Sequence, residues 1–405
     1  MLDDITRMPH PMIPTLSVQA LEADPHGVFR HYRPLTPVIA REGGGFIVLR
    51  AADVEGLIRD SRVRQAETEM LEQRGVADGA LFDLFRFGMV TSNGAAHRRR
   101  RAPFTRTFAA AMIAALRPAI RQGAEALIGE WHDRHEVDLV DQYAALIPAR
   151  TISTMLGLPD EDIPTFTKLV YSVSRFLSFT FAPEELDGIR DDARALYSYV
   201  EALLANRRQA PASDVLSTFL ADAAAKDELS AVEIVVQVVI LIIGGTDTTR
   251  VAMASQVSLL LQHRAQWDAV REDPSLARHA VAEALRFEPS VGSVGRVALE
   301  DIVLDDTLIP AGQFLTLSTM SAMRDDAAQA RPDVFDIHRT DGRRLHLVFG
   351  GGAHRCLGEA LAWAELEEGL CTLAARLPGL RLAGAPPPLR GHMGIRRIGR
   401  MPVAW

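Results

Sequence analysis

Helical patterns run through most of this chain and constrain its fold more than any other feature. Apolar residues recur at helical spacing in consecutive segments: Ala95–Phe108, Ala109–Arg134, Asp141–Leu156, Ile163–Phe176, Pro183–Arg208 and Ser213–Ala225. A capping-type start at Ser230 opens a longer helix to about Gln262, and two shorter patterns follow at Arg264–Asp273 and Leu276–Phe287. Ala and Leu dominate and aromatic residues make up only 6% of the chain, which favours helices over a strand-rich sandwich. We expect a mainly α fold.

Strand patterns are short and few. Two flank the glycines at positions 43–45 as a hairpin, and others occur late in the chain: Pro37–Arg41, Phe46–Arg50, Val294–Ala298 and Phe314–Ser318. Short helical patterns at Asp24–Tyr32 and Ala51–Arg59 flank the hairpin. After a proline-rich segment of residues 1–20, no Pro/Gly/Ser-rich linker divides the chain. We therefore expect a single catalytic domain over residues 21–405.

Charge, apolar runs and cysteine number limit the class of protein. The formal net charge of −8 gives no overall attraction to nucleic acid or to anionic lipid, so neither is expected as a partner. The longest apolar run, Val235–Gly245, is much shorter than the roughly 20 residues that cross a bilayer. Met1–Leu16 has no apolar stretch like a signal peptide, and Cys356 and Cys371 are too few to staple a secreted fold. A cytoplasmic location, without a membrane, is expected.

The most specific motif is the segment Phe349–Gly358, which leads into the helical pattern Glu359–Leu377. Its glycines let the backbone approach a flat ligand closely, and a thiolate at Cys356 would be stabilised by the dipole of the following helix. Such a cysteine is a soft ligand for iron. The alternative is a buried structural cysteine beside a turn, which is how we interpret Cys371 within its helix.

A second motif places Gly244 and Gly245 inside the long helix, followed by Asp247 and Thr248. Each glycine in a helix interior costs roughly 1 kcal/mol relative to alanine, so a purpose is expected. A locally opened helix would leave room for a molecule such as dioxygen, and the carboxylate and hydroxyl could deliver protons. A kink packed against a neighbouring helix, with the polar side chains bonded to the backbone, is the alternative.

Two charged motifs carry weaker signals. Glu283 and Arg286 share a helix face and can form an ion pair, although a solvated surface pair fits the same spacing. His97 and Arg101 lie one helical turn apart and could clamp an anion. A solvated basic face is the alternative for the second pair.

Taken together, these motifs resemble the cytochrome P450 family, whose haem-ligand signature Phe-x-x-Gly-x-His/Arg-x-Cys-x-Gly is matched from Phe349 to Gly358. The resemblance implies the family's fold, with small β-sheets and with haem b between the long helix and the cysteine loop. It implies Cys356 as the iron ligand and Asp247 and Thr248 as the catalytic acid–alcohol pair. It also implies a set of cofactor-binding residues: His97, Arg101, Gly244, Gly245, Arg296, Phe349, Gly352, His354, Cys356 and Gly358. The two histidines and two arginines of this set would neutralise the haem propionates.

In the family, the Glu-x-x-Arg pair is structural, and Glu283 and Arg286 match it about 70 residues before the cysteine. A third partner usually comes from a Pro-x-Arg-Phe segment before the haem loop, but Val334 stands where that arginine would be. Arg339 or His338 is expected to substitute for it.

The resemblance implies a haem-thiolate monooxygenase that inserts one atom of O2 into a small hydrophobic substrate. The chain has no flavin or iron–sulfur segment, so electrons must come from a ferredoxin-like or flavodoxin-like donor with its NAD(P)H-dependent reductase. Four arginines are expected on the cysteine side of the haem, where an acidic donor could dock: Arg98, Arg99, Arg100 and Arg355.

Substrate contacts are expected at segments that correspond to those of the family: Phe85, Phe87, Met89, Phe176, Phe179, Ile240, Gly244, Val291 and Val294. Most of these residues are apolar, which favours a hydrophobic substrate, although apolar stripes also build ordinary cores. A peroxide-driven haem peroxygenase, a non-catalytic haem sensor or carrier, and a haem-free helical protein are the other functions considered. The Asp247 and Thr248 pair argues against the first two, because neither needs it.

Overall fold

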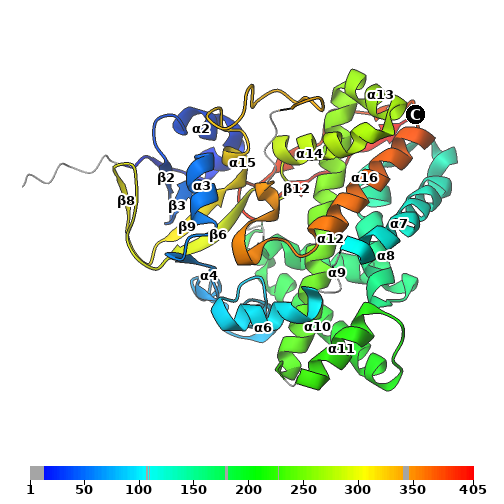
Figure 1. Cartoon of the computed structure of the whole chain (residues 1–405), viewed down its shortest axis with the longest axis horizontal. Helices are drawn as coiled ribbons and strands as arrows, with labels where there is room; N and C mark the ends of the chain where they lie inside the picture. The colour runs from blue at the N-terminus through cyan, green and yellow to red at the C-terminus, as the bar shows by residue number, and fades with distance from the viewer. Residues whose placement is uncertain (1–12, 106–107, 109, 178–180, 227, 341–345) are drawn as a thin grey trace, which may run out of the picture.

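The structure of this chain, a computed structural model, describes residues 13–105, 108, 110–177, 181–226, 228–340 and 346–405. Figure 1 shows most helices gathered on one side of the molecule, with the main sheet and the N-terminal helices on the other. The expected mainly α fold with small β-sheets is confirmed.

Most helices begin and end within three residues of the predicted bounds. The helices are α1 (Val18–Ala23), α2 (Pro25–Tyr32), α3 (Ala51–Leu57), α4 (Glu69–Glu72), α5 (Gly79–Phe87), α6 (Gly94–Thr105), α7 (Ala110–Trp131), α8 (Leu146–Leu156), α9 (Ile163–Leu177), α10 (Leu186–Gln209), α11 (Val215–Lys226), α12 (Ala231–Gln262), α13 (Arg264–Glu272), α14 (Ala277–Phe287), α15 (Thr319–Ala322) and α16 (Glu359–Arg376). The helices α1, α4, α5 and α15 were not predicted. Three of them have six residues or fewer, too few for helical periodicity to stand out.

The long helix α12 passes through the centre of the helical side and contacts α5, α8, α9, α10, α14 and α16. It begins with a capping box, in which Ser230 Oγ accepts from the Glu233 amide and the Glu233 carboxylate accepts from the Ser230 amide. Its length and apolar composition would suffice to cross a bilayer, but most of that surface is buried inside the protein. The helix is therefore the central element of the core.

The main sheet has six strands in the order β1-β2-β3-β9-β6-β4. The strands of the structure are β1 (Thr15–Leu16), β2 (Val38–Arg41), β3 (Phe46–Val48), β4 (Val63–Arg64), β5 (Glu136–Asp138), β6 (Ser293–Ala298), β7 (Ile302–Leu304), β8 (Thr307–Ile309), β9 (Phe314–Ser318), β10 (Arg381–Leu382), β11 (Leu389–Arg390), β12 (Arg397–Ile398) and β13 (Pro402–Ala404). The predicted hairpin is β2 and β3, with Val38 opposite Val48. Strand β6 pairs antiparallel with β9, which sets Arg296 opposite Leu315.

The N-terminal segment differs from the prediction in the part that the structure describes. Residues 13–20 do not stand apart from the fold, because β1 pairs parallel with β2 and Ser17 caps α1. Residues 1–12 lie outside the described residues.

Candidate functional site

A cavity of about 440 Å³ lies between α12 and the loop that precedes α16. Its wall also takes residues from α5, β6 and a turn near the C-terminus. Residues in the wall include Phe85, Met89, Ile240, Gly244, Gly245, Thr248, Val291, Val294, Arg296, Phe349, His354, Cys356, Gly358, Glu365, Met393 and Ile395. Most of these side chains are apolar, so the cavity suits a hydrophobic guest.

The loop that carries Cys356 is shaped by glycine and by its own backbone. Gly350 and Gly352 have φ angles of 69° and 61°, in the left-handed region that favours glycine. The Cys356 amide donates to the Phe349 carbonyl over 2.8 Å, which closes the loop. Gly352 faces residues 58–59, which follow α3. It therefore shapes the loop but does not line the cavity.

The Cys356 side chain is exposed to the cavity, which lies between α12 and this loop. Burial raises the pKa of its thiol, and the Gly358 amide opposes that rise by donating a hydrogen bond to the sulfur. A bound metal cation would reverse the balance, because a coordinating thiol is deprotonated outright. The loop therefore offers a single sulfur ligand to a metal held in the cavity.

Two arginines reach the cavity without a carboxylate partner among the described residues. Arg296 is buried and donates to Gln65 Oε1 over 3.0 Å and to the backbone carbonyl of Gly295 over 2.8 Å. Burial lowers the pKa of Arg296 to about 10, which records an unfavourable environment for its charge. Arg101 donates to the Arg355 carbonyl in the cysteine loop over 2.6 Å. Both guanidinium groups can bind an anion in the cavity.

Two histidines lie near these arginines: His354 lines the cavity, whereas His97 does not. The rings of His97 and His354 are 4.0 Å apart, and Nε2 of His97 is buried without a hydrogen-bond partner among the described residues. Burial, together with His97 and the two arginines, lowers the pKa of His354 to about 3. An anionic group would offset these unfavourable charges and bond to the orphaned nitrogen. Two carboxylates beside a flat ring, as in haem, fit this cluster.

The two glycines of α12 have different surroundings. A Cβ at Gly244 would meet open space, whereas a Cβ at Gly245 would lie 2.3 Å from Cδ1 of Ile152 on α8. Gly245 therefore permits close helix packing, and Gly244 leaves space on the cavity side. Thr248 lines the cavity, and its Oγ1 donates to the Gly244 carbonyl over 3.0 Å. The helix itself is continuous from Ala231 to Gln262.

Asp247 is buried and does not line the cavity. Its Oδ1 accepts from Nη2 of Arg250 over 2.6 Å, and the Arg250 guanidinium lies 4.4 Å from the centre of the Tyr171 ring. Asp247 and Thr248 therefore point to different surroundings in this structure. The sequence already indicated that Arg250 can pair with Asp247, because residues three apart share a helix face.

Sequence reasoning missed Glu365 of α16, which lines the cavity and is fully buried. Burial raises the pKa of Glu365 to about 8, against a smaller opposing effect of the Thr151 and Thr249 hydroxyls. Its Oε1 has no hydrogen-bond partner within the described part of the chain. Glu365 therefore holds a proton at neutral pH. The signal was a carboxylate within the apolar pattern of the helix that follows Cys356.

The predicted substrate contacts fall into three groups. Phe85, Met89, Ile240, Gly244, Val291 and Val294 line the cavity. Phe87 and Phe176 do not: the Phe87 ring lies beneath the Arg100 guanidinium, and the buried Phe176 packs on Phe85 and Phe181. Phe179 lies outside the described residues.

The Glu283 and Arg286 pair is buried, with Nε of Arg286 2.7 Å from the Glu283 carboxylate. Arg286 also donates to the Pro332 carbonyl over 2.7 Å. The third partner is Arg339, whose Nε is 3.3 Å from the same carboxylate. His338 does not make this contact. The solvated surface pair is thereby excluded, since these side chains tie α14 to the segment before the cysteine loop.

The basic run of α6 is less available than expected. Arg99 and Arg100 both pair with Glu233 at the start of α12, at 2.6 and 2.8 Å, and Arg100 is buried. Arg355 pairs with Glu359 at 2.5 Å. Of these four arginines, only Arg98 is exposed.

Comparisons with known proteins agree with this geometry. The sequence model of the family described as Cytochrome P450 matches residues 80–376. The plant-inducible cytochrome P450-pinF1 of Rhizobium radiobacter is 43% identical over 389 residues, which are 95% of this chain and 91% of that protein. Nocardicin C N-oxygenase of Nocardia uniformis subsp. tsuyamanensis is 33% identical, with 89% of each chain covered.

Solved structures give the same result. Epothilone D-bound cytochrome P450epoK superposes with a TM-score of 0.87 at 29% identity, over 96% of this chain and 97% of the other. P450BioI in complex with an acyl carrier protein carrying hexadec-9Z-enoic acid gives a TM-score of 0.86 at 26% identity, over 96% and 100%.

Proposed function

Because this chain belongs to the cytochrome P450 family, we propose that its cavity would hold haem b, with Cys356 as the residue that would bind the iron. The protein is a haem-thiolate monooxygenase, which uses O2, an organic substrate and electrons from a redox partner. The observation that supports the assignment most strongly is the single sulfur that faces a largely apolar cavity beside two arginines without carboxylate partners.

The protein would hold the haem through its propionates and would control the reaction around it. His97, Arg101, Arg296 and His354 would hold the two propionates, because the two charged arginines have no carboxylate partner among the described residues and Nε2 of His97 has no hydrogen-bond partner there. Bound haem supplies the activation of dioxygen, assisted by electron donation from the thiolate. The protein positions the substrate, keeps water out and supplies protons.

Proton supply is proposed to run through Thr248. Its hydroxyl lies in the cavity wall and can turn from the Gly244 carbonyl towards the cavity. Asp247 is proposed to replenish that proton after its carboxylate rotates away from Arg250, which holds it at 2.6 Å. Glu365 is a further proton-bearing group of the wall. These roles make Asp247 and Thr248 the catalytic pair.

The proposed substrate is a small hydrophobic molecule held by Phe85, Met89, Ile240, Val291 and Val294. A ferredoxin-like or flavodoxin-like protein with its NAD(P)H-dependent reductase is proposed as the electron donor, and it would dock on the cysteine side near Arg98. The protein is proposed to be soluble and cytoplasmic, with residues 21–405 acting as one catalytic domain.

Oxygen-18 labelling tests the proposed reaction. Hydrophobic compounds that shift the spin state of the holoenzyme are incubated with ¹⁸O2, NADPH and a surrogate ferredoxin and reductase. One labelled oxygen atom in the product, with no label from H2¹⁸O, is expected. Turnover with peroxide alone that exceeds the donor-driven rate would favour a peroxygenase. Haem binding without turnover across all spin-shifting compounds would favour a carrier or sensor.

A further inference from the structure

Two segments about 100 residues apart in the sequence meet in the cavity wall. Residues 290–294, after α14, contribute Val291 and Val294, and residues 393–395 contribute Met393 and Ile395. Few backbone contacts join them directly. The amide of residue 292 donates to the carbonyl of residue 394, the amide of residue 396 donates to the carbonyl of residue 290, both over 2.8 Å, and Val291 forms an isolated bridge with Ile395. So short a pairing is marginal on its own.

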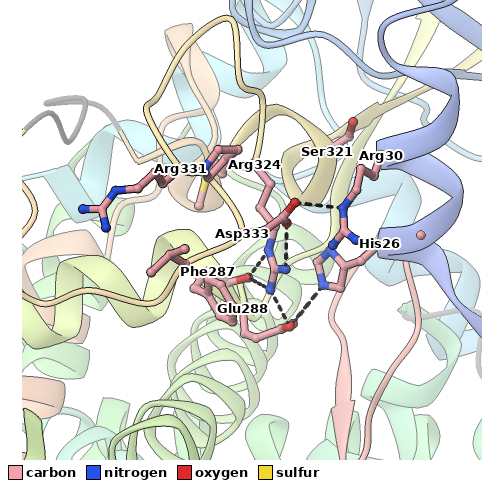
Figure 2. A network of polar contacts seen from close by, with 12 residues as sticks. His26, Arg30, Phe287, Glu288, Ser321, Arg324, Arg331 and Asp333 are labelled. Carbon is pink, nitrogen blue, oxygen red and sulfur yellow. Dashed lines mark hydrogen bonds and ion pairs between the residues drawn. The ribbon is translucent and has the colours of Figure 1, made fainter. Parts of the chain in front are cut away.

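A buried ionic cluster lies directly behind this junction. Glu288 ends α14 two residues before the first wall segment, and Arg396 follows the second segment immediately. Nη1 of Arg396 is 2.5 Å from the Glu288 carboxylate, and Nη2 of Arg324 is 2.8 Å from it. Figure 2 shows Glu288 between Arg324 and His26, whose Nε2 is 3.1 Å away. One carboxylate therefore joins three cationic or polar groups from separate parts of the chain.

Arg396 carries the link into the second segment. Its side chain is almost fully buried, at 2% exposed, and its remaining nitrogens donate to the carbonyls of Gly391 and Leu389 over 3.0 and 3.2 Å. Glu288 is its carboxylate partner among the described residues. Although burial raises it, the pKa of Glu288 is held far below its ordinary value by Arg396, His26 and Arg324, so the carboxylate is charged at any working pH.

We propose that Glu288 and Arg396 are positioning residues that lock the two wall segments together and thereby set which ligand shapes the cavity accepts. Neither side chain lines the cavity, so both act through the backbone of the neighbouring wall residues. With the pair intact, Val291 and Ile395 present one fixed surface. Without it, a ligand that presses on this surface must first order the two segments, which weakens its binding. The inference rests on the proposed function, because it takes this cavity as the substrate site.

The probes are two iron-binding azoles of different size, titrated by their Soret shift into the holoenzyme. Imidazole is too small to reach the wall, whereas clotrimazole presents three phenyl rings to it. Glu288→Gln keeps the shape of the side chain and removes its charge. We expect its Kd for clotrimazole to rise about tenfold while its Kd for imidazole stays at the wild-type value. Glu288→Asp keeps the charge on a shorter side chain, so its Kd for clotrimazole should lie between those of the wild type and Glu288→Gln. It replaces Glu288→Gln in the test if that variant does not fold.

Asp214→Asn is the matched control. Asp214 forms a comparably buried pair with Arg207 at 2.9 Å, and neither residue lines the cavity. It should lose stability without changing either Kd. The double variant Glu288→Gln/Arg396→Met should weaken clotrimazole no more than Glu288→Gln alone, because both changes break one link.

The inference is overturned if both azoles weaken equally, if neither changes, or if Asp214→Asn shifts the ratio of the two constants in the same way. Failure of the proposed function would look different. It would appear as loss of the thiolate-type ferrous–CO spectrum in the unaltered protein, before any azole is added.

Discussion

Replacing Arg296 tests whether the cavity is built for an anionic cofactor. The lowering of the Arg296 pKa from 12.5 to about 10 corresponds to about 3 kcal/mol of unfavourable burial in the haem-free protein. Its hydrogen bonds to Gln65 and to Gly295 return about 1 kcal/mol each. Arg296→Met should therefore raise the free energy of unfolding of the haem-free protein by about 1 kcal/mol.

The haem-bound protein should respond in the opposite direction. A propionate would offset the buried charge of Arg296, and removing one partner of a buried ion pair costs about 3 kcal/mol or more. Haem should then leave Arg296→Met about a hundredfold faster than the wild type. The rate of haem loss from Arg296→Lys, which keeps the charge, should lie between those of the wild type and Arg296→Met.

Two assays measure the two effects separately. Urea unfolding of the haem-free proteins gives the first, and haem transfer to excess apomyoglobin gives the second. Haem transfer from Arg296→Met at the wild-type rate would refute the role of Arg296 at a propionate. A large loss of stability in the haem-free variant would refute the burial cost inferred for its charge.

Three further changes test other parts of the site. Thr248→Ala should reduce product formation by about a hundredfold or more and divert electrons to peroxide, whereas Thr248→Ser should retain most activity; equal loss in both would contradict the proton role. Gly245→Ala should destabilise the protein by about 1–3 kcal/mol in thermal unfolding, because its Cβ would meet Ile152, whereas Gly244→Ala should be tolerated in stability and weaken the binding of ligands in the cavity. The pKa of Glu365 is near 4.5 in the unfolded chain and about 8 in the folded protein. Between pH 5 and 8, the free energy of unfolding of the wild type should therefore fall by about 1 kcal/mol per pH unit relative to that of Glu365→Gln. Parallel curves of stability against pH for the two proteins would show that Glu365 does not hold the proton.

Much of the fold was accessible from the sequence because long helices carry their own signals in periodicity, apolar composition and capping residues. Helices α7, α9 and α12 begin and end within three residues of their predicted bounds, and β9 matches its predicted range. Short elements were harder to foresee. The β1 strand has two residues and forms only because β2 offers an unpaired edge, which no local pattern reveals.

The site divides in the same way. The cysteine loop depends on neighbouring glycines and could be read from their spacing, and so could the Glu283 and Arg286 pair. Which aromatic ring faces the cavity depends on packing between helices, so Phe176, buried against Phe181, could not be told from Phe85 by sequence. The raised pKa of Glu365 likewise arises from burial against α12, which requires the tertiary structure.

The ferrous–CO absorption spectrum of the haem-bound protein, measured beside that of Cys356→Ala, tests the central claim most directly. The proposed function predicts the long-wavelength Soret band of a thiolate-ligated haem in the wild type and its absence in the variant. A haem-free wild type, or the same band in Cys356→Ala, would contradict the assignment of Cys356 as the iron ligand.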